Sequence, residues 1–283
     1  MDKRIKVAIL DDFEVQTEDV KPIEYSEISV DSHGFMVAAT VEKHSKNKIE
    51  FLYYDIYNTN NQGQKIIRAL NRCFKYGVNI VVMSFVFSPW RYRYLIEKQL
   101  KQLKQNGCKI VAADYNHNNK CGYPASSKYV VGVGNNNQHE LNDRKRGIQV
   151  VGDVRPEFIK CGNKYRIFSG TSKATAIIAA CMNDECDIKI TSEIEESEIK
   201  QMNFEQNKLY KDICQKGIMN VRMEDDIFKT LKNKEDIEDM VLHILKLFGL
   251  ETKCMDMKYE DFKTLKNLMD YIGKCYEKMG CNS

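Results

Sequence analysis

Ser172 stands in a stretch whose residue types could support nucleophilic catalysis. Residues 168–176 read FSGTSKATA, and an apolar run to Cys181 follows. The pattern predicts a tight turn that places Ser172 in the first turn of a helix, where unpaired backbone N–H groups would face a developing oxyanion. Taken alone, such a turn is more often a helix cap, and a serine hydroxyl needs a base before it becomes a nucleophile.

Two other residues could supply and orient that base. The apolar run 5–10 ends in Asp11 and Asp12, and His33 opens a helix-like run of small and apolar residues. A histidine can take the proton of a serine while an aspartate holds the imidazole in one tautomer. Each residue also has an ordinary explanation, since two aspartates after a strand commonly form a turn or a helix cap. A lone histidine at a helix start is commonly a surface residue.

The elements that would bring these residues together alternate along the chain. Apolar runs typical of buried strands are separated by amphipathic helices, a pattern that favours an α/β fold with a mostly parallel sheet and helices on both faces. Functional side chains collect at the carboxyl ends of such strands. The expected strands are 5–10, 49–56, 78–85, 108–113, 129–133 and 148–151, and the expected helices include 62–76 and 89–105.

The composition changes after Asn183. Residues 184–200 are acidic and polar, and the chain beyond them places apolar residues three and four apart over 221–231, 234–248 and 265–279. We therefore expect a first domain over 1–200 and a small all-α domain over 201–283, with a docking or recognition role.

Charge and cysteine content exclude several classes of protein. The 43 basic and 40 acidic residues give a net charge of +3, which is too balanced to indicate nucleic-acid binding. No secretory signal or membrane-length apolar segment is apparent. The ten cysteines contain no C-x-x-C pair, so we expect reduced thiols in a cytoplasmic protein, with no metal and no cofactor.

Five sequence blocks together resemble the subtilases, the subtilisin-like serine peptidases, over about residues 5–182. They are VAILD, HGFMVAAT, GVNIVVMS, GCKIVAADYN and SGTSKATA, and they occur in the order of the family. The resemblance implies a triad in which Asp11 orients the base His33 and Ser172 is the nucleophile. It also implies that the side chain of Asn116 is an oxyanion donor.

The chain departs from the family at several places. The usual D-T-G is replaced by Asp11-Asp12-Phe13, the residues after His33-Gly34 are Phe35-Met36, and Ala176 stands at the proline of the serine helix. None of these changes removes a catalytic atom. The C-terminal part faintly resembles the last helices of an acyl carrier protein, but it lacks the serine that would carry phosphopantetheine.

The resemblance also locates a substrate pocket, whose walls in subtilases commonly contain glycines. Bulkier residues stand at the matching positions here, and we expect a narrowed pocket that accepts Gly, Ala or Ser on the acyl side of the cut. If Phe87 and Tyr115 rotate outward, the pocket stays open. The wall positions are Ser84, Phe85, Val86, Phe87, Asp114 and Tyr115.

These residues predict a serine endopeptidase that works through an acyl-enzyme, resolved by water or by another nucleophile. The expected partner is a peptide or protein substrate, with a ribosomal natural-product precursor as one candidate, and neither nucleic acid nor membrane. The oligomeric state is left open. The alternative is a catalytically silent subtilase-like binding module, which the altered residues beside Asp11 and His33 favour.

Overall fold

The computed structural model divides the chain into two compact units. The sheet unit comprises Met1–Arg155 and Ser169–Thr191, and the hairpin unit comprises Pro156–Phe168 and Ser192–Ser283. Each unit is described by itself below. The structure describes residues 4–15, 20–57, 61–87, 92–115, 122–135, 148–184, 224–231 and 233–278.

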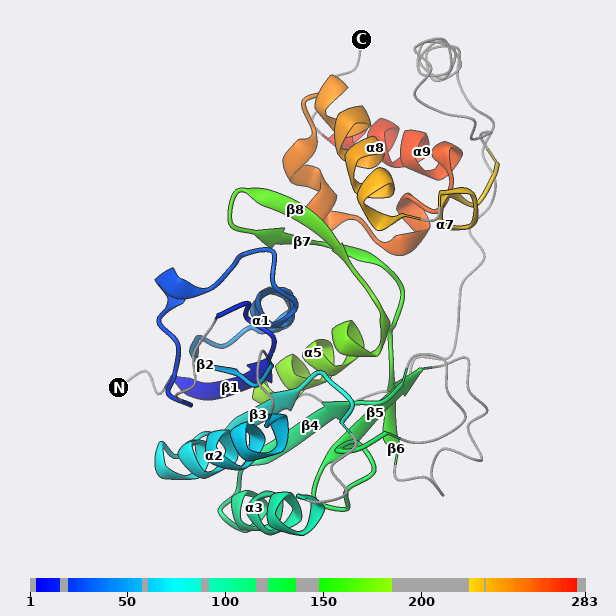
Figure 1. The fold of residues 1–283 in the computed structure, drawn as a ribbon. Coiled ribbons are helices and arrows are strands. Elements are labelled where there is room, and N and C mark those ends of the chain that lie inside the picture. Colours follow the sequence, from blue (N-terminus) through cyan, green and yellow to red (C-terminus); the bar gives the residue numbers. More distant parts are fainter. Residues whose placement is uncertain are drawn as a thin grey trace. The chain divides into compact units, whose positions relative to one another are not determined.

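The sheet unit is built on six parallel strands in the order β2-β1-β3-β4-β5-β6 (Figure 1). Because all strands run the same way, their carboxyl ends share one edge, and Asp11 at the end of β1 lies beside Asp55 at the end of β2. The strands are β1 (Ile5–Asp11), β2 (Ile49–Asp55), β3 (Ile80–Met83), β4 (Lys109–Ala113), β5 (Val131–Asn135) and β6 (Ile148–Gly152).

Helices cover both faces of this sheet. Helices α1 (His33–His44) and α5 (Gly170–Asn183) pack against each other on one face, while α2 (Gln62–Lys75) and α3 (Arg93–Gln105) pair on the other (Figure 1). The predicted α/β fold with a parallel sheet is therefore confirmed. None of the helices in the described ranges is long and apolar enough to cross a membrane.

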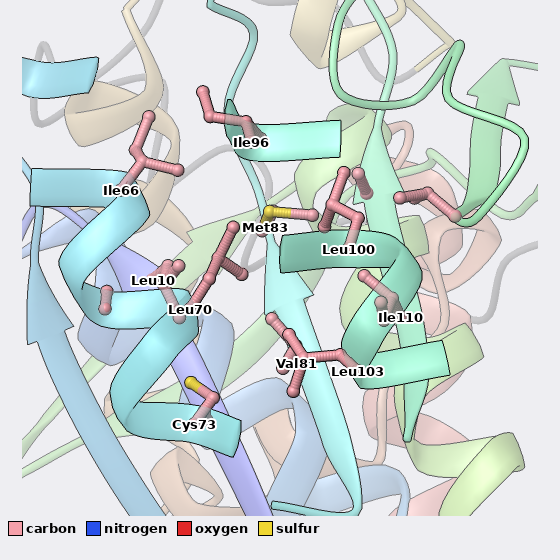
Figure 2. Packing of buried hydrophobic residues seen from close by; sticks show 14 of the residues in the cluster. Leu10, Ile66, Leu70, Cys73, Val81, Met83, Ile96, Leu100, Leu103 and Ile110 are labelled. Atoms are coloured by element: carbon pink, nitrogen blue, oxygen red, sulfur yellow. The ribbon is translucent and has the colours of Figure 1, made fainter. Parts of the chain in front are cut away.

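The core between the sheet and α2 and α3 follows from the apolar spacing of the two helices. Side chains of Leu70 and Cys73 on α2 and of Leu100 on α3 point onto the middle of the sheet, where Val81 and Met83 of β3 meet them (Figure 2). All five are 0% exposed. Burial of this apolar surface, at roughly 25 cal/mol per Å², fixes the strands whose ends carry the polar residues.

The hairpin unit combines two strands with the C-terminal helices. The antiparallel strands are joined by a tight turn at Gly162 (φ 59°), and Phe158 and Ile167 enter the same apolar cluster as α8 and α9. This hairpin, which lies outside the range 201–283 expected for a small all-α domain, packs with the described helices of that range. The elements of the unit are β7 (Glu157–Cys161), β8 (Lys164–Phe168), α7 (Ile227–Thr230), α8 (Lys234–Leu247) and α9 (Leu265–Lys278).

The helix expected over 221–231 is shorter in the described part of the chain, where α7 begins at Ile227. Asp226 explains this start, because its side chain accepts hydrogen bonds from the backbone N–H groups of Phe228 and Lys229 and so caps the helix. The helices expected over 234–248 and 265–279 correspond to α8 and α9 within one residue.

Candidate active site

Asp11 and His33 come together at the carboxyl edge of the sheet. Asp11 is the last residue of β1 and is 1% exposed, and its Oδ1 lies 2.7 Å from Nδ1 of His33. The same oxygen accepts a 2.8 Å hydrogen bond from the backbone N–H of Asp12. His33 is the first residue of α1, which Ser32 caps by accepting the backbone N–H of Phe35 at 3.3 Å. With Nδ1 donating to the carboxylate, Nε2 is the imidazole nitrogen that can take a proton.

A close contact explains why glycine follows His33. The backbone N–H of Gly34 donates to the carbonyl oxygen of Asp12 at 2.9 Å, which ties the start of α1 to the end of β1. A Cβ at position 34 would lie 2.6 Å from the ring of Phe13 and 2.9 Å from that carbonyl oxygen. Phe13 is fully buried, so only glycine lets the helix start approach the strand end closely enough for His33 to reach Asp11.

Burial raises the pKa of the Asp11 carboxyl group. Desolvation raises its pKa above the ordinary value, and the charge and hydrogen bond of His33 and the N–H of Asp12 oppose that rise. Its second oxygen, Oδ2, is buried and has no hydrogen-bond partner in the described ranges. The stabilisation of an ionised Asp11 therefore rests on two donors at Oδ1, of which the imidazole is one.

Ser172 is delivered by a turn that requires glycine. Gly170 has a φ of 86°, in the left-handed region where a side chain is strained, and it is the first residue of α5. Its backbone N–H donates to the carbonyl oxygen of Val154 at 2.8 Å. Ser172 follows as the third helical residue, half-buried, so its backbone N–H is one of the four that a helix start leaves without an intrahelical partner.

Two hydrogen bonds locate the serine turn on neighbouring strands. The hydroxyl of Thr171 donates to the carbonyl oxygen of Asp114, after β4, at 2.6 Å. The hydroxyl of Ser172 lies 3.5 Å from the carbonyl oxygen of Ser84, after β3, a long contact. Asn116, expected as an oxyanion donor, lies outside the described residues.

An ion pair between a buried lysine and a partly exposed aspartate follows the serine. Lys173 is 2% exposed, and its Nζ lies 3.5 Å from Oδ2 of Asp153, just after β6. Arg155 holds the same carboxylate through Nε at 2.9 Å and through a second nitrogen at 3.2 Å. Desolvation opposes ionisation of Asp153, but the hydrogen bonds of Arg155 and the charge of Lys173 outweigh it and lower the pKa. The start of α5 is thus fixed to the end of β6 next to Ser172.

Val86 and Asp114, two of the expected pocket residues, converge on one glycine. A Cβ at Gly122 would lie 2.7 Å from Cγ1 of Val86 and 3.2 Å from Oδ1 of Asp114. The same oxygen accepts the backbone N–H of Gly122. The backbone carbonyl oxygens of Asp114 and of Ser84, two residues before Val86, also contact the serine turn.

The other expected pocket residues have different surroundings. Phe85 is 5% exposed and meets the ring of Tyr57 edge-on at 6.4 Å, within the core between the sheet and α2 and α3. Phe87 packs against the same core, and its backbone N–H donates to the carbonyl oxygen of Tyr123 at 2.8 Å. Tyr115 is 38% exposed. Among the four bulky wall residues 85, 86, 87 and 115, the valine is the one that lies against Gly122.

A second charge pair, which the sequence analysis did not single out, supports the turn after Asp11. Nζ of Lys65, on α2, lies 3.4 Å from Oδ2 of Asp55 and donates to the carbonyl oxygen of Tyr57 at 3.0 Å. Oδ1 of Asp55 accepts the backbone N–H of Phe13 at 3.1 Å. The sequence signal was weak, because an aspartate that ends a strand commonly serves as a turn residue. Among the described residues, no group of three or more His, Cys, Asp and Glu side chains is arranged to bind a metal ion.

Comparisons with known proteins add a likeness at low identity. No protein-family model and no curated protein matches the chain. Among solved structures, the prenylagaramide maturation protease PagA matches with a TM-score of 0.45 and 18% identity over 65% of this chain and 78% of that one. Sphericase matches with a TM-score of 0.49 and 18% identity over 65% and 77%. The epidermin leader peptide processing serine protease EpiP from Staphylococcus aureus matches with a TM-score of 0.46 and 14% identity over 80% and 72%. At these identities and TM-scores, the comparisons report a likeness only, and the chemistry of this chain is argued from its own side chains.

Proposed function

We propose that this chain is a serine endopeptidase whose triad is Asp11, His33 and Ser172. The observation that carries the proposal is the 2.7 Å contact between Nδ1 of His33 and a carboxylate oxygen of Asp11, which is 1% exposed. A histidine bound in this way keeps Nε2 for proton transfer. Ser172 is half-buried at the start of α5, a helix that packs against the helix of His33.

The proposed reaction follows from these roles. Nε2 of His33 takes the hydroxyl proton of Ser172 as its oxygen attacks the peptide carbonyl, and Asp11 stabilises the imidazolium that forms. The backbone N–H of Ser172 and the side chain of Asn116 are the proposed donors to the oxyanion. His33 then protonates the leaving amine, and water or another nucleophile releases the acyl group.

We further propose that the enzyme prefers a small residue on the acyl side of the cut. The support is the convergence of Val86 and Asp114 on Gly122, beside strand ends that also contact the serine turn. A large substrate side chain would have to displace a valine methyl group or a hydrogen-bonded carboxylate, which carries a cost of overpacking or desolvation.

A selective pocket fits maturation of particular peptides better than general digestion. PagA and EpiP are named for peptide maturation and leader-peptide processing, and we extend that role to this chain as a proposal only. In it the substrate is a peptide precursor, cleavage takes place in the cytoplasm, and the C-terminal helices serve in docking or recognition. No cofactor or metal is required by the proposed chemistry.

A fluorophosphonate probe tests the triad directly, because it labels only a serine that a base has activated. We expect labelling of the wild-type protein, loss of labelling in Ser172→Ala and in His33→Ala, and retention in the control Ser26→Ala, an exposed serine in the short 3-10 helix Tyr25–Glu27. No labelling of folded wild-type protein would refute the proposal. It would instead favour the alternative, a catalytically silent binding module. The long contact between the Ser172 hydroxyl and the carbonyl oxygen of Ser84 is the observation that supports this alternative.

A further inference from the structure

A cavity of about 570 Å³ lies beside α2, and half of its six described lining residues are cations. Arg68, Arg72 and Lys75 recur at spacings of four and three residues, so their side chains share one face of the helix. We call the cavity the basic groove. Its lining residues are Val20, Arg68, Asn71, Arg72, Lys75 and Tyr76.

Among the residues that the structure describes, these cations have no carboxylate partners. In the part of the chain that the structure describes, Arg68, Arg72 and Lys75 form no ion pair. A further cation, Lys6, donates from Nζ to the carbonyl oxygen of Tyr76 at 3.4 Å, at the edge of the groove. Like charges three and four residues apart destabilise a helix by about 0.2 to 0.5 kcal/mol per pair. The cluster is local, because the whole chain carries 43 basic and 40 acidic residues.

The groove also offers apolar surface. Val20 is 4% exposed and lies in the core, whereas Tyr76 is 45% exposed at the end of α2. The hydroxyl of Tyr54 is buried and has no hydrogen-bond partner among the described residues; burial raises its pKa, and the charge of Arg72 opposes that rise. A fitting ligand therefore carries several negative charges and an apolar side chain.

We propose that the basic groove binds an acidic segment of the peptide substrate, with carboxylates at the three cations and an apolar side chain against Tyr76. The link to a substrate rests on the proposed peptidase function. Charge complementarity supports a peptide, because a nucleic acid is held by a longer row of cations that neutralises many phosphates, and this groove offers four at most.

The groove lies at the end of the sheet opposite the proposed triad. Lys6, which contacts Tyr76, is near the start of β1, while Asp11 is its last residue. The five steps between them span roughly 17 Å at about 3.3 Å per residue. A bound peptide therefore needs at least about five extended residues between its acidic segment and the bond to be cut. The recognised segment and the cleaved bond are thus at different places along the substrate.

The experiment measures binding without cleavage. A fluorescein-labelled peptide with four glutamates around one leucine is titrated into the Ser172→Ala protein, and anisotropy is read at low and physiological salt. The test variant adds Arg68→Glu and Arg72→Glu. The matched control adds Lys98→Glu and Lys101→Glu on the surface of α3, which changes the net charge equally.

We expect the test variant to bind at least about tenfold more weakly, with the control within about twofold of the parent. Added salt should weaken binding by the parent. Thermal denaturation checks the fold, and Arg68→Gln with Arg72→Gln replaces the charge reversal if the reversal unfolds α2. The glutamine version of the peptide should not bind.

Three results would overturn the proposal: equal losses in test and control variants, equal binding of the glutamine peptide, or tighter binding of a single-stranded oligonucleotide of the same charge. Failure of the groove and failure of the peptidase are separable, because binding uses a protein without its nucleophile and fluorophosphonate labelling uses no peptide. Fluorophosphonate labelling without peptide binding would refute only the proposed role of the basic groove. Peptide binding without labelling would refute the proposed peptidase function, and the bound peptide would then not be a substrate.

Discussion

Lys173 and Asp153 form an ion pair with Nζ and Oδ2 3.5 Å apart, one residue beyond the proposed nucleophile. The lysine is 2% exposed, whereas the aspartate is 41% exposed and is also held by Arg155. The almost fully desolvated ammonium group of Lys173 therefore holds the serine turn at the end of β6.

Removing only the aspartate should be costly. Asp153→Asn takes the carboxylate from a buried ammonium, and we expect a loss of about 1 to 3 kcal/mol in the free energy of unfolding, less than for a fully buried pair because Asp153 is partly exposed. Adding Lys173→Met should restore most of the stability, since no buried charge remains. Urea denaturation of the single and double variants measures this. A double variant as unstable as Asp153→Asn would show that the pair is not what stabilises the turn.

The same pair predicts a loss of stability in acid. The pKa of Asp153 is lowered in the folded protein, so its contribution is present above the unfolded-state pKa and is lost as the pH falls through the folded-state value. The melting temperature of the wild type should therefore drop more steeply in acid than that of the double variant. Parallel melting curves against pH would contradict this.

Replacement of Asp11 should change catalytic activity and folding stability in opposite directions. We expect Asp11→Asn to lower kcat by about 10⁴, because the histidine loses the partner that sets its tautomer. Burial raises the pKa of the carboxyl, so ionisation costs stability as the pH rises through the folded-state value. The melting temperature of Asp11→Asn relative to the wild type should therefore increase from acidic to neutral pH. A marked destabilisation at neutral pH would mean that the carboxylate supports the fold.

Gly34→Ala should disturb the proposed site through packing. Alanine favours a helix by up to about 1 kcal/mol over glycine, but its Cβ would lie 2.6 Å from the ring of Phe13, and overpacking typically costs about 1 to 3 kcal/mol. We expect lower stability and weaker fluorophosphonate labelling. Adding Phe13→Leu should recover part of both. Full labelling in Gly34→Ala would show that the contact does not position His33.

Val86→Gly should broaden the proposed specificity. Removing the methyl groups that lie against Gly122 opens space beside the serine turn. The ratio of kcat/KM for a peptide with Leu on the acyl side to that for a peptide with Ala should rise by about tenfold, since two further buried carbon groups at about 0.8 kcal/mol each amount to roughly 1.6 kcal/mol. Phe87→Gly is the control, because Phe87 is partly buried against the core between the sheet and α2 and α3 and not against Gly122. If only this control broadened the preference, Val86 would not be the wall.

The sequence by itself determined the strand and helix pattern of the sheet unit. Strands 5–10 and 108–113 and helix 62–76 were predicted within one or two residues, because their apolar periodicity reflects burial on one or both faces. It also singled out Asp11 and His33 before their 2.7 Å contact was known. The residues alone also had ordinary explanations, and their roles came from the resemblance of the sequence blocks to the subtilases.

Only the tertiary structure decided which distant residues become partners. Lys173 reads as one polar residue in an alanine-rich helix, and its pairing with Asp153 depends on how α5 meets β6. The assignment of hairpin 156–168 to the C-terminal helices was likewise out of reach, because Phe158 and Ile167 could have been buried against either unit. Periodicity tells which side of an element is buried, whereas the partner that covers it is chosen by packing across the whole chain.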